Sequence, residues 1–513
     1  MVAALLRVLH SGIQDSRLLP PKGNPNIELF SKVFIRAGRF TTQWVRLDFD
    51  SQPSFGAKSI ITIPRKGHLV SRLYIVTTMP DIDTIQRSAV AAASALGKNF
   101  AGPYFTWTNS LGHALIQQIT LTIGGARVEQ IDGRIMEVLD EFYTPLEKLN
   151  LANTLLSRNM SNFPHFNVQN NVIANPSIAI TPLPLWFSRG DPGVYLPIDA
   201  LAVDPVKLNV QFSPVSSLYV SSAKQRIAVN QPVVGGAGYF PMASSPFYMN
   251  DPSGPLVYGL TGDPSVGIHA SIIPGVSMPS TFVPGDTYIM AEYIYLDAPE
   301  ANRFRISDIE VPVTQHYAFD PFDTNGSLRA TIPMIIPNPT RNIFFYAQRY
   351  EAPFYNAPFL ATRDLSGAGT SVPWWPNALP ISTRCPGPIQ PAYVFSDSEP
   401  LSSILLMYEG KLVRYSTTSP SIFRSLLPSY EMKKSPFVNR YYYSLHFGLN
   451  HGNMNASQPC GEANLDKVLN ISLQLEFKQG LQATIPRYII YSWAQTYNIF
   501  RVYAGRGGLL FAY

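Results

Sequence analysis

The segment from residue 107 to residue 133 reads WTNSLGHALIQQITLTIGGARVEQIDG and decides the fold class of this chain. Apolar side chains alternate with polar ones through its middle, at Leu115, Ile119, Leu121 and Ile123. This period of two is typical of a half-buried β-strand. Gly124-Gly125 separates the run from a second extended stretch, where a hairpin turn needs residues that tolerate positive φ. The segment therefore predicts a β-hairpin rather than a catalytic or phosphate-binding loop.

His113 lies in the same segment, just before the first strand. A catalytic or metal-binding histidine needs a carboxylate, a cysteine or a second histidine at relay or ligand spacing, and the segment offers none. We therefore expect a structural role for His113.

The length and composition of the chain indicate a large protein with covered surfaces. A chain of 513 residues is long enough for two or more domains. Charged residues make up 14% of it and hydrophobic residues 46%, whereas ordinary soluble domains have roughly 25% charged residues. Much of the surface is therefore either rich in hydroxyl and amide groups or covered by partners, and a chain with many neighbouring subunits would show so little charge.

The charges and cysteines exclude several classes of protein. The net charge is +5, but the basic residues are scattered, so we expect no direct binding of nucleic acid. Cys385 and Cys460 are too few for a disulfide framework, which favours a reducing compartment. The apolar run in the start MVAALLRVLH is broken by Arg7 and is too short for the hydrophobic region of a secretory signal. No later run approaches the ~18 apolar residues of a membrane span. We expect a soluble protein that is not secreted.

Further strands are predicted by the same alternation throughout the chain, at residues 45–49, 206–212, 441–449 and 469–477. Helices are few. RIMEVLDEFY, residues 134–143, gathers Ile135, Val138, Leu139 and Phe142 on one face. A shorter helix is expected after Asp297, where Pro299 suits a first helical turn. The pattern predicts a mainly antiparallel β protein with accessory helices.

Two stretches rich in proline and glycine interrupt this pattern. Residues 219–285 are also nearly free of charge, and we expect a connector or insertion there between two β-rich halves. Residues 350–400, with VPWWPNALP and CPGPIQP, predict a long loop in the second half. Loops of this length in compact domains usually carry function or contacts.

Several short motifs suggest chemistry, but a structural interpretation is stronger for each. Arg189-Gly190-Asp191 is a cell-adhesion tripeptide when displayed on a loop, yet it also forms a natural turn. DPFDTNG, residues 320–326, lacks the remaining ligands of a calcium loop. Asp81 and Asp83 follow a predicted strand, where paired carboxylates usually face solvent.

Known enzyme motifs are also missing from the sequence. AGRGG, residues 504–508, lacks the lysine and hydroxyl of a P-loop, and no nucleophile-elbow, zinc-protease or Walker pattern occurs. We predict that the protein is not an enzyme, with no catalytic residues, no cofactor, no metal and no small-molecule substrate.

The order of these motifs resembles that of a known family, the double jelly-roll major capsid proteins of nucleocytoplasmic large DNA viruses. The similar segments run nearly from end to end: GNPNIELFSKVFIRAGRFTTQW at 23–44, FGAKSIITIPRKGHLVSRLYIVTTMP at 55–80, the segment at 107–133, LPLWFSRGDPGVYLPIDALAVDPVKLNVQF at 183–212, YIYLDAPEANRF at 293–304 and YNIFRVYAGRGGLLFAY at the end. Departures lie near Cys460 and in the two expanded stretches.

The resemblance implies an all-β fold of two tandem eight-stranded antiparallel jelly rolls, with long loops and a few short accessory helices. The expected division is an N-terminal arm at 1–25, a first jelly roll at 26–218, the Pro/Gly-rich stretch at 219–285 and a second jelly roll at 286–513. We expect residues 350–400 to form an outward tower. The arm either faces inward or packs on its own subunit.

The implied function is structural. Homotrimers with a pseudo-hexagonal outline would tile the icosahedral shell of the virion, assembled in the host cytoplasm, with minor capsid proteins and an internal membrane beneath. One alternative is a minor capsid or penton-like component with the same fold. Another is a carbohydrate-binding or glycan-cleaving β-sandwich, which predicts a secretory route and a carboxylate pair that the sequence does not offer.

Overall fold

The computed structural model describes most of the two predicted halves. The described residues are 39–97, 105–148, 154–158, 168–169, 172–173, 176–221, 257–259, 272–277, 282–350, 352–359, 361–363, 399–436, 440–449, 451–452, 461–479 and 485–511. The predicted arm at 1–25, both cysteines and most of the stretches 219–285 and 350–400 lie outside these ranges. The predictions made for them stay predictions.

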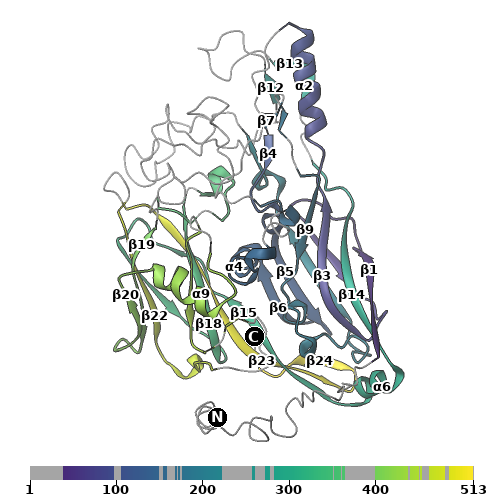
Figure 1. The fold of residues 1–513 in the computed structure, drawn as a ribbon, viewed down its shortest axis with the longest axis vertical. Helices are drawn as coiled ribbons and strands as arrows, with labels where there is room; N and C mark the ends of the chain where they lie inside the picture. Colours follow the sequence, from purple (N-terminus) through teal and green to yellow (C-terminus); the bar gives the residue numbers. More distant parts are fainter. Residues whose placement is uncertain are drawn as a thin grey trace, which may run out of the picture.

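The first half of the chain forms a sandwich of two four-stranded antiparallel sheets, drawn in purple to blue-green in Figure 1. One sheet has the order β1-β14-β3-β9, with strands Phe40–Asp48, Thr287–Leu296, Leu69–Thr78 and Ile178–Pro182. The other has the order β2-β10-β5-β6, with strands Lys58–Thr62, Val206–Phe212, Ile116–Ile123 and Ala126–Asp132. In β10 every second side chain is buried, as its alternation predicts.

The predicted hairpin is confirmed by β5 and β6. Gly124 and Gly125 connect the two strands with φ angles of 60° and 89°, in the left-handed region that favours glycine. Ile119, Leu121 and Ile123 are buried in the core of the sandwich. The segment that decided the fold class therefore builds a wall of the first sandwich.

The second half forms another antiparallel sandwich, drawn in green to yellow. One sheet has the order β15-β23-β18-β21, with strands Ile309–Ala318, Tyr488–Tyr503, Thr340–Arg349 and Tyr442–His446. Two short strands, β16 at Phe322–Asp323 and β24 at Arg506–Leu509, also pair with β23. The facing sheet has the order β17-β22-β19-β20, with strands Arg329–Met334, Ile471–Phe477, Leu401–Tyr408 and Leu412–Thr417. The predicted pair of tandem jelly rolls is confirmed.

The strand that follows the Pro/Gly-rich stretch belongs to the first sandwich. β14 pairs along its whole length with β1, and it pairs with β3 on its other side. The expectation that the second jelly roll begins at residue 286 is wrong for this strand. The chain crosses to the second sandwich through helix α6, Ala298–Ile306, because β15 is the first strand after β14 to join the second half.

Strands β18 and β21 of the second sandwich are buried on both faces. All side chains of β18 and β21 are buried. The predicted strand at 441–449 therefore has no solvent-exposed face within β21. Phe345 and Tyr443 stack with ring centroids 5.2 Å apart, whereas Phe344 on the other face contacts Phe142 of the first half. In the facing sheet, β22 keeps the predicted alternation, although Leu469 precedes the strand and is 87% exposed.

Helices are accessories in the described part of the chain. α2 is Asp83–Ala95, α3 is Leu111–Ala114, α4 is Gly133–Tyr143 and α9 is Leu427–Glu431. Short two-stranded ribbons, β4 (Phe105–Trp107) with β11 (Tyr219–Ser221), β7 (Val168–Gln169) with β8 (Val172–Ile173) and β12 (Val257–Gly259) with β13 (Ile272–Ser277), gather with α2 toward one end of the first sandwich (Figure 1). Within the described ranges, no helix has the length and apolarity needed to span a bilayer.

Candidate functional site

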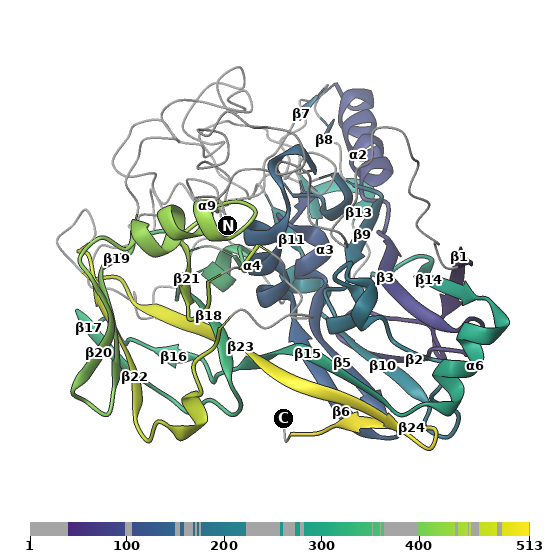
Figure 2. The ribbon, with the colours of Figure 1, turned by 60° about the horizontal axis from the view of Figure 1, so that its bottom comes forward.

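Helix α4 lies between the two sandwiches and contacts both of them (Figures 1 and 2). The Asp132 side chain caps it by accepting a hydrogen bond from the Ile135 amide at 2.8 Å. Gly133 is required at the first position, because a Cβ there would come within 2.2 Å of the His113 carbonyl oxygen and 2.5 Å of the Ile116 carbonyl oxygen. The helix ends before Pro145, as the sequence predicts.

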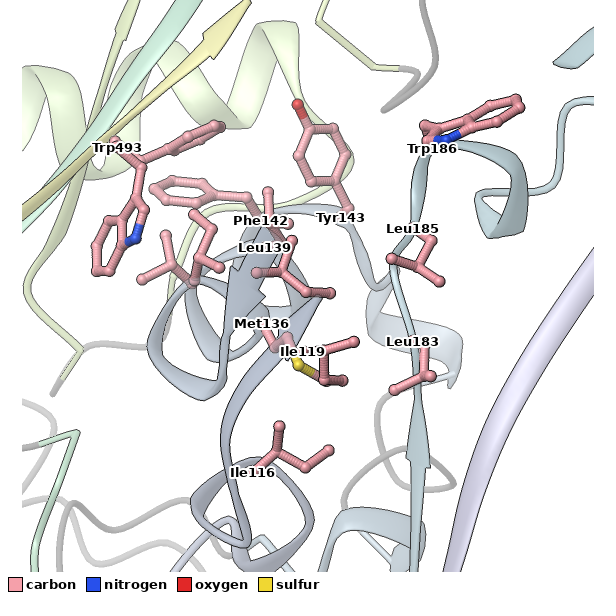
Figure 3. Close-up of a cluster of buried hydrophobic side chains, with 14 of the residues drawn as sticks. Ile116, Ile119, Met136, Leu139, Phe142, Tyr143, Leu183, Leu185, Trp186 and Trp493 are labelled. Carbon is pink, nitrogen blue, oxygen red and sulfur yellow. The ribbon is translucent and has the colours of Figure 1, made fainter. Parts of the chain in front are cut away.

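The predicted apolar face of α4 is completely buried. Its residues Ile135, Val138, Leu139 and Phe142 are each at most 1% exposed. Figure 3 shows Leu139, Phe142 and Met136 between Ile119 of the first sandwich and Trp493 of the second. Phe142 contacts Phe344 at a ring-centroid distance of 5.6 Å. The apolar core is therefore continuous from one sandwich to the other through this helix.

The opposite face of α4 carries buried charges that the sequence analysis did not foresee. Glu137 is fully buried, and its Oε2 lies 2.7 Å from both His113 Nδ1 and Arg158 Nη2. Its Oε1 accepts hydrogen bonds from Arg440 Nη1 at 2.9 Å and from the Ser110 hydroxyl at 3.0 Å. Arg440 comes from the second half, so one carboxylate joins the two halves of the chain.

Neighbouring charges extend this cluster. Arg158 also binds Asp140, and its Nη1 lies 3.7 Å from Glu141 Oε1. Lys434 Nζ, from the second half, lies 3.4 Å from Glu141 Oε2. Three carboxylates on α4 thus face three cations, and two of those cations belong to the second half. We call Glu137, Asp140, Glu141, Arg158, Lys434 and Arg440, together with His113, the junction cluster.

The electrostatics of the junction cluster keep Glu137 ionised. Burial alone would raise the pKa of Glu137, but the guanidinium groups of Arg158 and Arg440 hold that pKa well below its usual range. The same balance lowers the pKa of Asp140, because the Arg158 cation outweighs burial. A carboxylate held ionised by two guanidinium groups is a poor general acid or base. The cluster therefore fixes the junction rather than carrying out proton transfer.

His113 has the expected structural role, but with a partner that the sequence analysis missed. Glu137 is 24 positions further along the chain, and the hairpin returns it to the histidine. The signal was present in Glu137 and Glu141, two acidic residues at i and i+4 on a helix with an otherwise strongly apolar face. A buried carboxylate requires a cationic partner.

A second buried cluster crosses the junction at Arg189. Its guanidinium donates to Glu129 Oε1 at 3.0 Å, and it donates to the Thr314 carbonyl at 3.1 Å and to His316 Nδ1 at 3.1 Å. The Arg189 side chain is 1% exposed and Glu129 is fully buried. The Arg-Gly-Asp tripeptide therefore directs its arginine into the junction, and a receptor could not reach this guanidinium without rearrangement of the turn.

The titration of His316 follows from this arrangement. Burial and the neighbouring Arg189 cation lower the pKa of His316 to about 4. The neutral ring accepts the Arg189 hydrogen bond at Nδ1, and protonation there would replace attraction with repulsion.

The end of β23 forms a third tie. This strand runs from the second sandwich to the base of the first, where β24 lies beside β6 (Figure 2). The Gly507 amide donates to Asp204 Oδ2 at 3.1 Å, and the Val203 amide donates to the Gly505 carbonyl at 2.9 Å. The AGRGG motif is thus a hairpin turn, with Ala504 and Gly505 at φ angles of 49° and 79°.

The remaining candidate motifs also have structural roles. Asp81 Oδ1 accepts hydrogen bonds from the Asp83 and Thr84 amides, both at 3.0 Å, at the start of α2. In DPFDTNG, Asp323 pairs with Arg487, and Asn325 and Gly326 turn the chain with positive φ. The structure does not bring these residues together with the junction cluster.

Comparison with known proteins identifies relatives of the whole chain. Residues 28–248 match the model of the major capsid protein N-terminus, and residues 305–508 match the model of the large eukaryotic DNA virus major capsid protein. Capsid protein 1 of Acanthamoeba polyphaga mimivirus is 25% identical over 43% of this chain, and the match covers only 36% of that longer protein. The major capsid protein of Paramecium bursaria Chlorella virus 1 is 23% identical over the full length of both chains.

A solved structure of the PBCV-1 virus capsid has the same fold. It matches 95% of this chain and 100% of its own with a TM-score of 0.63, at 18% sequence identity. The two tandem sandwiches are therefore arranged as in that capsid protein.

Proposed function

This chain belongs to the major capsid proteins of large eukaryotic DNA viruses, which form the capsid shell of the virion, and from that membership we propose that it assembles as a homotrimer with a pseudo-hexagonal outline. The observation that carries the proposal is the junction cluster. It fixes two similar sandwiches side by side, so three chains around one axis would present six similar units.

The exposed apolar residues support this arrangement. Three subunits close a ring when the outer side of the first sandwich meets the outer side of the second sandwich of the next chain. On the first sandwich, edge strand β1 exposes Phe40 (63%) and Trp44 (43%). On the second, Val413 of β20 and Tyr430 of α9 are 47% and 82% exposed. Figure 1 places β1 and β20 at opposite sides of the molecule.

Electron microscopy of the purified protein tests the outline and the contact together. The wild-type protein should show hexagonal particles, and Phe40→Glu or Tyr430→Glu should yield mostly single subunits. Leu96→Glu is the control, because Leu96 is similarly exposed (53%) but lies at the end of α2, at the end of the first sandwich where the ribbons gather. Monomeric wild-type particles, or hexagons in both variants, would contradict the proposed contact.

We also propose that residues 1–25 dock the shell onto minor capsid proteins or a membrane beneath it. The support is the apolar start of the sequence, followed by LLPPKGNPN, which ends any helix. Deleting residues 1–22 should leave trimers intact but reduce incorporation into particles. Normal particle yield would remove the docking role, and loss of trimers would favour an arm that packs on its own subunit. The copy number in purified particles separates a major from a minor shell component.

A further inference from the structure

A group of three side chains outside the junction has the chemistry of a metal site. Glu431 ends helix α9, His446 ends strand β21, and His451 follows five residues later. One ligand atom of each lies within 4.8 Å of the other two. Figure 2 shows α9 beside β21, so the three side chains meet where the helix lies against this strand of the second sandwich.

The distances suit a tetrahedral zinc ion. Glu431 Oε2 lies 2.5 Å from His446 Nδ1 and 3.8 Å from His451 Nε2. Ligand bonds of about 2.0–2.2 Å at tetrahedral angles place two ligand atoms roughly 3.3 Å apart. These two separations lie on either side of this value, and all three ligand atoms lie within 4.8 Å of one another, so side-chain adjustments of up to about 1.5 Å would complete the geometry.

His451 supplies the independent observation that favours a ligand. Its ring is 0% exposed, and its Nε2 has no hydrogen-bond partner among the described residues. A buried ring nitrogen normally has a partner, because leaving it without one is costly. The His446 and His451 rings are stacked, with centroids 4.4 Å apart, so both rings approach the same carboxylate.

The surroundings of His446 fit a metal ligand as well. The Ser444 hydroxyl lies 2.8 Å from His446 Nε2. A hydroxyl that accepts from Nε2–H leaves the Nδ1 lone pair free to bind a cation, which is how outer partners orient metal-binding histidines. The Tyr415 hydroxyl also donates to the His446 carbonyl and holds the end of the strand.

We propose that Glu431, His446 and His451 bind one Zn²⁺ ion that clamps α9 onto the second sandwich. Two imidazoles and a carboxylate are ligands that Zn²⁺ favours over Mg²⁺ or Ca²⁺. The Glu431 side chain is 28% exposed, so a water molecule can reach the fourth coordination position of the ion from that side. No metal was predicted from the sequence, and ligands separated by 15 and 5 positions match no short motif. All three ligands come from one chain.

Zinc titration of the full-length protein tests the site. Protein stripped with EDTA and dialysed should take up one Zn²⁺ per chain by elemental analysis, and its melting temperature should rise with added Zn²⁺. Glu431→Gln should weaken binding at least 100-fold and abolish the rise. Glu476→Gln is the matched control, because Glu476 is 32% exposed, lies in the same sandwich and pairs with Arg329. It should bind Zn²⁺ as the wild type does.

A second variant keeps the test decisive if Glu431→Gln fails to fold. Ser444→Ala retains all three ligands and removes only the partner of His446, so it should weaken binding by roughly 10- to 100-fold. Co²⁺ used as a probe should give visible absorption bands in the wild type that Glu431→Gln lacks. No Zn²⁺ uptake by the wild type, or equal affinity in the wild type and both variants, would overturn the proposal and leave a hydrogen-bonded carboxylate–histidine pair.

Discussion

At the scale of single residues, Glu137 is the point on which the junction depends. It is fully buried, and its four hydrogen-bonding neighbours are His113, Ser110, Arg158 and Arg440. Only Arg440 comes from the second half. Taking charges out of water is costly, and the cost is offset only while each buried charge keeps its partner. The junction is therefore sensitive to changes that leave one member unpaired.

Glu137→Gln should lower the free energy of unfolding by about 3–5 kcal/mol, because two buried guanidinium groups lose their shared countercharge. Urea denaturation followed by tryptophan fluorescence measures the change. The exposed pair of Glu476 and Arg329 provides the comparison, since Arg329 is 79% exposed, and Glu476→Gln should cost less than about 1 kcal/mol. Equal losses in the free energy of unfolding of the two variants would show that the buried network stabilises the protein no more than an exposed ion pair does.

His316 predicts how stability depends on pH. The ring is neutral in the folded protein down to a pKa of about 4, whereas in the unfolded chain it takes up a proton near pH 6.5. The stabilisation is therefore complete above pH 6.5 and is lost progressively as the pH falls toward 4, by about 3 kcal/mol in all. Urea denaturation at pH 7 and pH 5 should show a smaller loss of stability in His316→Gln than in the wild type. If His316→Gln retains the full acid sensitivity of the wild type, the assignment to His316 is wrong.

The sequence predicted the roles of some single residues and not of others. Gly124 and Gly125 were predictable as turn residues, because a two-residue hairpin needs positive φ. The sequence favoured a turn over an adhesion site at Arg189-Gly190-Asp191, but only the fold shows that Glu129, Thr314 and His316 surround the arginine. Partners 60 or more positions apart leave no local pattern in one sequence.

At the scale of elements, the sequence predicted strands best where one face of the strand is exposed to solvent. β10 and β22 alternate strictly, because one face meets the core and the other is more accessible to solvent. β18 and β21 are buried on both faces, so their polar positions do not mark a surface. β14 was assigned to the wrong sandwich, since its own alternation says nothing about which strands it pairs with.

Helix α4 is the element that couples the two sandwiches, and Phe142 provides its apolar contact with Phe344. Phe142→Ala should lower the free energy of unfolding by about 3–5 kcal/mol. Scanning calorimetry should show the single transition of the wild type broaden or split, because each sandwich has its own sheets but shares this helix. Leu96→Ala, at an exposed position after α2, should leave the transition unchanged. A sharp single transition in Phe142→Ala would show that the sandwiches are coupled mainly elsewhere.

At the scale of the whole molecule, the low charge content and the exposed apolar side chains both support the proposed trimer. A chain with 14% charged residues and exposed aromatic residues on both outer sides is suited to burial between neighbours. Interfaces of the obligate class bury roughly 2,000 Å² or more. The junction cluster ties the two sandwiches together, which would favour such burial by limiting how the two outer sides move relative to each other.

Light scattering on the purified full-length protein at micromolar concentration and neutral pH measures whether the chains form the proposed trimer. Each chain has a mass of 56.9 kDa, and we expect one species with the mass of three chains that persists on dilution. A monodisperse species with the mass of a single chain under the same conditions would contradict it.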